Sequence, residues 1–301
     1  MDSTSGSDVI MMMNNNQHLL RLVNVNKEFG VGTIDEVKAL DSINLNVYAG
    51  DFITIIGSNG AGKSTLLNVI AGVYPPERGG HVNINNKNIT NLTEHKRAQY
   101  FGRVYQDPHV GTAAKMTIGE NLSLAISRGS PRGLRNATTR RRLDSFKEIL
   151  APLHLGLEDR MNTRVGTLSG GQRQALALVM ATISRPSVLL LDEHTAKLDP
   201  NTAGIVLTLT ENIVSNEKIT ALMVTHNMEH ALRYGNRLLM MHKGKLIVDL
   251  DSQQRKGIKV SDLLTAFQQA SGEQLADDSI LLNTYFPSDN KRTEEKSPEN
   301  L

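Results

Sequence analysis

A glycine-rich segment after a short apolar run constrains the fold of this chain more than any other feature. The pattern G-x-x-x-x-G-K-[ST], followed by a threonine, occurs at Gly57, Ser58, Asn59, Gly60, Ala61, Gly62, Lys63, Ser64 and Thr65. The apolar run 52–56 precedes this segment, and Leu66, Leu67 and Ile70 follow it at helical spacing. A strand, a tight turn and a helix N-terminus in this order direct backbone N–H groups and a helix dipole toward one point. The segment therefore predicts a phosphate-binding loop.

Charged and hydroxyl side chains at two places in the sequence suit a nucleoside triphosphate and its metal ion. Lys63 is placed to reach the β- and γ-phosphates, and the Ser64 hydroxyl is placed to bind Mg²⁺. An acidic pair, Asp192 and Glu193, ends the apolar run 189–191. In NTPases with such a loop, an aspartate after a buried strand supports Mg²⁺, which is the role we predict for Asp192. Glu193 is then placed to orient or deprotonate the water that attacks the γ-phosphate.

The order of apolar and helix-like stretches predicts an α/β fold. Continuous apolar character is typical of strands covered on both faces of a largely parallel sheet, and it occurs at 52–56, 188–191 and 221–224. Helix-like stretches alternate with these runs, as at 64–71 and 172–182. A hairpin is predicted from two short apolar runs, 238–241 and 246–248. A later amphipathic stretch, 260–267, predicts a helix that either caps the core or regulates the protein.

The middle of the chain has a different character and predicts an inserted helical part, at about 107–180. Helices are expected at 118–126 and 138–150, with a Gly/Pro-rich break at 128–133. This part is locally basic, with arginines at Arg128, Arg132, Arg135, Arg140, Arg141 and Arg142. The basic segment is either a solvated loop and helix face or a docking surface for an acidic partner.

Composition limits the classes of function. The formal net charge is +2, from 33 basic and 31 acidic residues, which gives no reason to expect nucleic-acid binding. There is no cysteine, so disulfides and thiolate metal sites are excluded. No apolar run reaches the length needed to span a bilayer, so a pore for any transported solute must come from another chain. We expect one domain at 18–282, between a disordered tail at 1–17 and a flexible tail at 283–301.

A five-residue motif makes the prediction more specific. The run Leu168, Ser169, Gly170, Gly171 and Gln172 is the signature of the ATP-binding cassette (ABC) family, which this chain resembles from about Leu20 to Ile280. The resemblance implies a P-loop NTPase core of the RecA-like type. It also implies a mixed sheet, an N-terminal antiparallel β part and an inserted α-helical subdomain. ATP and Mg²⁺ are the expected ligands, and the expected activity is ATP hydrolysis.

The resemblance also assigns roles to single residues outside these motifs. Gln106 matches the glutamine that senses the γ-phosphate and completes the Mg²⁺ shell, and His226 matches the switch histidine. Asp199 matches the loop that crosses between two subunits. Phe29 is placed like the aromatic residue that stacks on adenine, although Val31 in the following loop is an alternative.

A second copy of the chain completes the site in the family. The signature serine and glycines form a second anion site, which the family places against the P-loop of a partner in a head-to-tail homodimer. Each ATP then lies between two copies, and hydrolysis opens the pair. An integral membrane permease, and through it an extracytoplasmic substrate-binding protein, are the further partners implied. The protein would lie at the cytoplasmic side of the membrane.

Two residues depart from the usual family pattern, and more than one biological role is open. His194 replaces the usual proline after the catalytic glutamate, and Lys197 replaces the usual small residue before Leu198. Flanking residues resemble bacterial importer subunits that are often associated with tryptophan or tyrosine uptake. The alternatives are an exporter subunit and a soluble regulatory ABC ATPase that acts on a ribosome or another protein.

Overall fold

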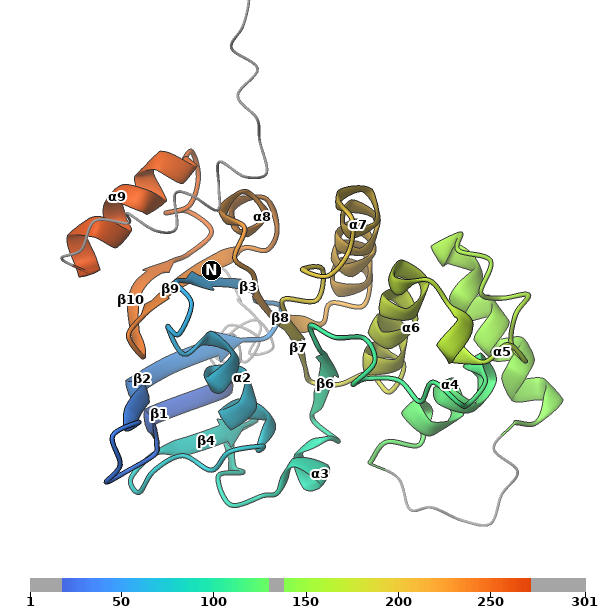
Figure 1. Ribbon diagram of the computed structural model, residues 1–301, viewed down its shortest axis with the longest axis horizontal. Coiled ribbons are helices and arrows are strands. Elements are labelled where there is room, and N and C mark those ends of the chain that lie inside the picture. Colours follow the sequence, from blue (N-terminus) through green and yellow to red (C-terminus); the bar gives the residue numbers. More distant parts are fainter. Residues whose placement is uncertain (1–17, 130–137, 272–301) are drawn as a thin grey trace, which may run out of the picture.

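The computed structural model describes residues 18–129 and 138–271 (Figure 1). Its strands are β1 (His18–Phe29), β2 (Val37–Tyr48), β3 (Phe52–Gly57), β4 (His81–Ile84), β5 (Lys87–Asn88), β6 (Phe101–Val104), β7 (Val188–Asp192), β8 (Thr220–Val224), β9 (Arg237–His242) and β10 (Lys245–Leu250). Its helices are α2 (Lys63–Ala71), α3 (Glu94–Arg97), α4 (Ile118–Ile126), α5 (Arg140–Leu150), α6 (Gly170–Thr182), α7 (Pro200–Asn216), α8 (Met228–Arg233) and α9 (Val260–Ser271). The tails predicted at 1–17 and 283–301 lie outside the described residues.

A six-stranded mixed sheet forms the centre of the molecule, in the order β10-β9-β3-β8-β7-β6. Five strands, β9, β3, β8, β7 and β6, run parallel to one another. The edge strand β10 runs antiparallel to them and pairs with β9. The three continuous apolar runs of the sequence are β3, β7 and β8, and their side chains are buried almost throughout. The predicted strands, the predicted terminal hairpin and the α/β fold are therefore confirmed.

Helices cover both faces of this sheet because successive side chains of a strand point to opposite faces. On one face, Leu190 and Leu222 pack in one cluster with α2. On the other face, Leu189 and Leu191 pack in a second cluster with α6 and α7. The helix that follows the phosphate-binding loop and the helix that follows the signature therefore lie on opposite faces of one sheet.

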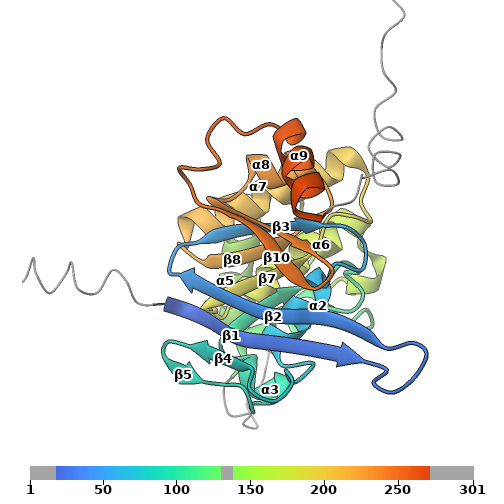
Figure 2. The ribbon, with the colours of Figure 1, turned by 90° about the vertical axis from the view of Figure 1, so that its left-hand side faces the viewer.

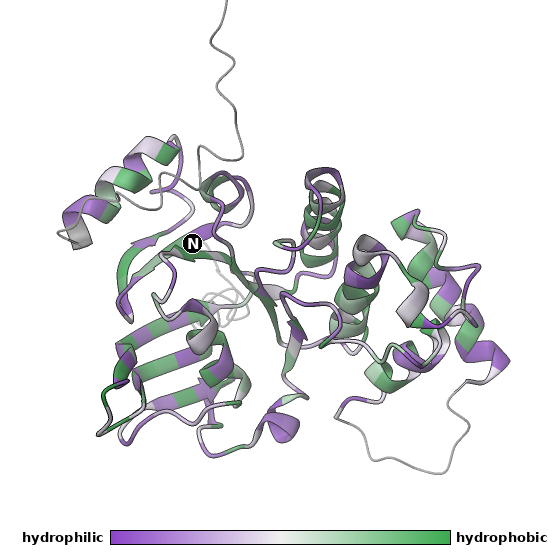
Figure 3. Cartoon of the chain, viewed as in Figure 1, coloured by the Kyte–Doolittle hydropathy of each residue, from purple (hydrophilic) through white to green (hydrophobic). Residues whose placement is uncertain are grey.

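A smaller antiparallel sheet, in the order β2-β1-β4-β5, packs beside the central one (Figure 2). Alternating hydropathy along β1, β2 and β4 is visible in Figure 3. Leu20 and Leu22 on β1 are buried in the same cluster as α2, whereas Arg21 between them is exposed. One face of this sheet is therefore core and the other is polar, as is usual for antiparallel sheets.

Helices α4, α5 and α6 share an apolar cluster of their own, on the right of Figure 1. Phe146 and Leu150 of α5 pack there with Leu122 of α4 and Leu176 of α6. A capping box starts α4: Thr117 accepts from the N–H of Glu120, and the Glu120 carboxylate accepts from the N–H of Thr117. The two helices expected at 118–126 and 138–150 are thus present, the second beginning at Arg140.

Helix α9, the last helix of the described residues, lies at the end of the molecule away from α4 and α5 (Figure 1). Leu263 and Phe267 are buried against Ala231 of α8 and Leu238 and Met240 of β9. The helix predicted at 260–267 is therefore present, and it covers part of the core. Within residues 18–129 and 138–271, no helix combines the length and the apolarity needed to cross a bilayer.

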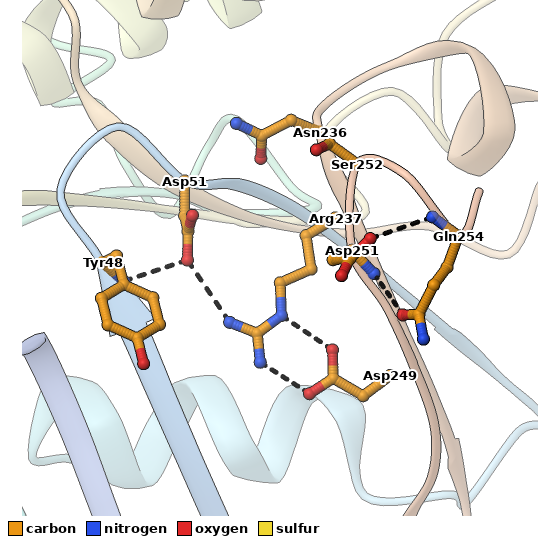
Figure 4. A pocket seen from close by; sticks show the side chains of 8 residues that line it. All are labelled: Tyr48, Asp51, Asn236, Arg237, Asp249, Asp251, Ser252 and Gln254. Atoms are coloured by element: carbon orange, nitrogen blue, oxygen red, sulfur yellow. Dashed lines mark hydrogen bonds and ion pairs between the residues drawn. The ribbon is translucent and has the colours of Figure 1, made fainter. Parts of the chain in front are cut away.

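A polar pocket lies at the amino end of β3, opposite the end that carries the glycine-rich loop (Figure 4). The Arg237 guanidinium occupies its centre, 2.6 Å from Asp249 and 3.4 Å from Asp51. The same side chain donates to the main-chain oxygen of Asn46. These contacts join β9 to β10 and to the β2–β3 turn, so we assign the cluster to the stability of the fold.

Candidate functional site

The glycine-rich loop runs from the end of β3 to the start of α2, and its backbone requires glycine. Gly57, Gly60 and Gly62 have φ angles of 150°, 77° and 97°. A Cβ atom at Gly57 would collide with the main-chain oxygen of Met241, and one at Gly62 with that of Ala39. Since these neighbours are backbone atoms of β9 and β2, the loop is held by two sheets. This curvature is the one expected of a phosphate-binding loop.

Lys63 lies inside the curve of this loop. Only 6% of the residue is exposed, and its ammonium donates to the main-chain oxygens of Gly57 (2.8 Å) and Ser58 (3.0 Å). A buried cation held by the loop backbone is placed to meet an anion that enters the loop.

Ser64 and Asp192 come together although they lie far apart in the sequence. The Ser64 hydroxyl donates to Asp192 Oδ1 at 2.9 Å, and the Arg103 guanidinium lies 3.7 Å from Asp192 Oδ2. Burial raises the pKa of Asp192 above its ordinary value, against the opposing effects of Ser64 and Arg103. A hydroxyl and a carboxylate side by side are oxygen ligands of the kind that Mg²⁺ takes, so this pair fits a magnesium ion beside the phosphates.

Glu193 is the centre of a second cluster. Gln106 Nε2 donates to Glu193 Oε2 at 3.0 Å, and His226 Nδ1 lies 3.8 Å from the same oxygen. The interaction with His226 lowers the pKa of Glu193 below its ordinary value, against the effect of burial, so the carboxylate is ionised at neutral pH. The φ angle of Glu193 is 43°, in the left-handed region that non-glycine residues rarely adopt. An ionised carboxylate in a constrained main chain can orient a water molecule and accept its proton.

The signature motif begins helix α6. The Ser169 hydroxyl accepts from the N–H of Gln172, and the Gln172 side chain accepts from the N–H of Ser169. Ser169 and Gly170 are exposed, whereas Leu168 is buried. Helix α6 packs on the face of the central sheet opposite to α2, and Leu168 packs with α4 and α5.

The predicted inter-subunit loop lies beside the signature. Asp199 is the N-cap of α7 and accepts from the N–H of Thr202 at 3.0 Å. Gly170 approaches Leu198, and a Cβ atom at Gly171 would collide with the Thr202 side chain. The glycines of the signature therefore permit close contact between the starts of α6 and α7.

Phe29 ends strand β1 and is half-buried. Its ring meets Tyr74 edge-on, with 5.2 Å between centroids, and the Lys27 ammonium lies 5.5 Å from the ring centroid. Val31, the alternative residue, is 66% exposed in the following turn. Both residues lie at the same tip of the smaller sheet.

Two residues of the site region have structural roles that the sequence did not reveal. Arg103 packs between Asp192 and the Tyr105 ring, and donates to Asn68 of α2. The sequence feature that could have pointed to Arg103 is its charge within the short, otherwise apolar strand β6. His194 is 2% exposed, and its Nε2 lies 3.0 Å from the Thr210 hydroxyl of α7.

Burial lowers the pKa of His194 to about 4, so the ring is neutral at pH 7. The Thr210 hydroxyl donates to the main-chain oxygen of Val206, so the ring donates its Nε2 proton to Thr210. The histidine at the usual proline position therefore joins the loop after Glu193 to helix α7.

Known proteins share both the sequence and this architecture. The ABC transporter family pattern matches residues 40–196. A "Tyrosine transport ATP-binding protein" of Clostridioides difficile (strain R20291) is 42% identical over 252 residues, which are 84% of this chain and all of the relative. A "Xylose/arabinose import ATP-binding protein" of Sulfolobus acidocaldarius is 30% identical over 249 residues, which are 83% of this chain and 94% of the relative.

A solved structure agrees with these relatives. The dimeric post-hydrolysis state of the ATP-binding cassette MJ0796, bound to ADP and Pi, superposes with a TM-score of 0.65 at 29% identity, covering 77% of this chain and 98% of that one. The family pattern includes the phosphate-binding loop, Gln106, the signature and the acidic pair. This chain therefore belongs to the ABC transporter family of ATP-binding cassettes, whose members hydrolyse ATP.

Proposed function

We propose that this chain is the ATP-hydrolysing subunit of an importer and that a separate membrane permease carries the solute. One observation carries the catalytic part of this proposal: Glu193 is held between Gln106 and His226, and the neighbouring Asp192 accepts from Ser64 of the phosphate-binding loop. Carboxylates with these partners beside a phosphate site can support Mg²⁺ and a nucleophilic water at once.

Each group of the site has a role in the proposed hydrolysis. The loop backbone and Lys63 bind the β- and γ-phosphates, and Ser64, Asp192 and Gln106 hold Mg²⁺. When bound, Mg²⁺ neutralises the charge that develops on the phosphate oxygens. Glu193 orients the attacking water and accepts its proton, while His226 keeps this carboxylate ionised.

A head-to-tail homodimer completes the proposed site. Because α2 and α6 lie on opposite faces of the sheet, the exposed Ser169 of one copy is free to meet the ATP bound by another copy. A helix N-terminus with exposed N–H groups binds anions, so the γ-phosphate would be held from both sides. The dimeric MJ0796 structure, with its bound ADP and Pi, supports this assembly.

We propose an amino acid, tyrosine in the first instance, as the transported solute. The support is the tyrosine transport relative. It is 42% identical to this chain, and the match covers the whole length of the relative. The xylose/arabinose relative matches at only 30%. An extracytoplasmic binding protein would deliver the amino acid to the permease, and this chain would act at the cytoplasmic face of the membrane.

A reconstitution experiment tests the transport proposal. The chain is purified from its native membranes together with the multispan membrane protein that copurifies with it, and the complex is placed in vesicles with ATP on the side of this chain. We expect ATP-dependent tyrosine uptake that is lost in Glu193→Gln. ATP-dependent efflux, or stable association of the chain with ribosomes and with no membrane protein, would contradict import.

A further inference from the structure

Two neighbouring side chains join the segment after β6 to the loop that carries Glu193. Gln106 donates to Glu193 Oε2 at 3.0 Å. The next residue, Asp107, accepts from Lys197 Nζ, also at 3.0 Å. Lys197 is four residues after Glu193 and two before Asp199, the N-cap of α7. The amide contact and the ion pair therefore bridge the same two segments side by side.

A contact other than the ion pair with Lys197 also orients the Asp107 side chain. The second carboxylate oxygen, Oδ1, accepts from the main-chain N–H of His109 at 2.9 Å, as in an Asx turn. His109 in turn lies within hydrogen-bond distance of the guanidinium of Arg173. Arg173 is buried in α6 and also donates to the main-chain oxygen of Val165. The segment that presents Asp107 is thus anchored to the helix that begins with the signature.

The loop on the other side, between Glu193 and Asp199, has turn hydrogen bonds of its own, from the N–H of Ala196 to the main-chain oxygen of Glu193 and from the N–H of Leu198 to that of Thr195. Glu193 has a φ angle of 43°, and such a conformation persists only where surrounding contacts hold it. His194 fixes the start of the loop to α7, and Asp199 fixes its end. Lys197 lies between these two anchors and reaches out of the loop toward Asp107. Its ammonium is therefore placed to set how close the loop lies to Gln106.

Exposure of the pair favours a role in positioning over a role in stability. The side chains of Lys197 and Asp107 are 55% and 38% exposed. Exposed ion pairs contribute little to the free energy of unfolding, but they can still favour one arrangement of two neighbouring loops. The family resemblance leads one to expect a small residue at the position of Lys197. A small residue could not form this ion pair, so the family pattern does not predict the contact.

We propose that Asp107 and Lys197 are a positioning pair for ATP hydrolysis. Their ion pair keeps the Gln106 amide on the Glu193 carboxylate and couples the segment after β6 to the loop that leads to Asp199. Neither side chain touches the reacting atoms in this role. The proposal concerns hydrolysis by this chain, so it is independent of the solute and of the permease.

Steady-state ATP hydrolysis by the full chain tests the proposal with Asp107→Asn, Lys197→Gln and the double variant. Asparagine keeps an oxygen for the His109 N–H and places its NH2 group toward Lys197, so only the contact with Lys197 is lost. Each single variant should lower kcat about three- to fivefold, the upper range for an exposed ion pair, with KM for ATP changed less than about twofold. The double variant should be no slower than either single variant, because both remove the same contact. Lys197→Arg should restore kcat to near the wild-type value.

Ionic strength gives an independent readout. Salt screens an exposed pair, so the kcat ratio of wild type to the double variant should shrink toward one as salt rises. The matched control is Arg185→Gln with Glu217→Gln, an exposed pair at 4.0 Å beside the amino ends of β7 and β8, which should leave kcat unchanged.

A loss of kcat in Lys197→Gln but not in Asp107→Asn would overturn the proposal. Losses that multiply in the double variant, or no loss in any variant, would also overturn it.

Discussion

At the scale of single residues, the two adjacent carboxylates at the end of β7, those of Asp192 and Glu193, have different environments. Burial raises the pKa of Asp192, which faces Ser64 and Arg103. Pairing with His226 lowers the pKa of Glu193. A cation is favoured beside the first carboxylate, and an ionised base is available in the second.

Replacement of Lys63 by alanine should weaken ATP binding. The ammonium would donate to phosphate oxygens that the backbone alone cannot neutralise, and charge-assisted hydrogen bonds of this kind contribute strongly. We expect the dissociation constant for Mg-ATP to rise at least about tenfold, measured by calorimetry. Lys87→Ala, an exposed lysine on β5, is the control. Unchanged affinity in Lys63→Ala would show that the loop does not hold the phosphates.

Replacement of Thr210 by valine should destabilise the protein through His194. The imidazole Nε2 proton would lose its acceptor inside the core, and an unpaired buried donor costs about 1–3 kcal/mol. Urea unfolding measures this loss of free energy. Thr208→Val changes an exposed threonine of the same helix and should stay within about 0.5 kcal/mol of wild type. Equal stability of the two variants would refute the assigned hydrogen bond.

Motif residues were predictable from the sequence because their chemistry is local. The loop 57–65, the acidic pair and Ser169 follow from residue type, spacing and the flanking apolar pattern. Arg103 and Thr210 were not predictable, because their partners are 89 and 16 residues away and are set by packing. The Asp107–Lys197 contact was hidden for the same reason, although Lys197 was already visible as a departure from the family pattern.

At the scale of elements, one buried arginine fixes the helix that carries the phosphate-binding loop. Arg97 is 1% exposed, and its guanidinium donates to the main-chain oxygens of Val69 and Ile70 at the C-terminal end of α2. It also donates to those of Leu92 and Thr90. Burial lowers its pKa to about 10, so it remains charged at pH 7 and complements the negative end of the helix dipole.

Replacement of Arg97 by methionine should therefore cost more than an ordinary surface change. Two buried and two half-buried hydrogen bonds to main-chain oxygens would be lost, and the free energy of unfolding should fall by at least about 2 kcal/mol. The exposed Arg78→Met is the comparison, with an expected change within about 0.5 kcal/mol. Both are measured by denaturant unfolding. Similar values for the two variants would mean that the guanidinium does not cap α2.

Elements were predicted from the sequence with differing success. The buried strands and the helices 64–71 and 118–126 were found because long apolar patterns decide them. The bounds of the N-terminal antiparallel sheet were not predicted, since the resemblance implied the part but not its strands. The long strands β1 and β2 pair with several irregularities of register, which weaken the alternating pattern in the sequence.

At the scale of the whole molecule, the central claim is that the functional unit contains two copies of the chain. Helix α2, which follows the glycine-rich loop, and helix α6, which begins with the signature, pack on opposite faces of one sheet. A partner copy is the simplest source of the missing half-site.

Sedimentation of the Glu193→Gln variant with and without saturating Mg-ATP tests this claim most directly. The variant should bind ATP without hydrolysing it, and so should shift from a 33.1 kDa monomer to a species of twice that mass. Adding Ser169→Arg should leave ATP binding intact and abolish the shift, because the arginine blocks the second anion site. If Glu193→Gln saturated with Mg-ATP stays monomeric, alone and with the permease, the two-sided phosphate site is contradicted.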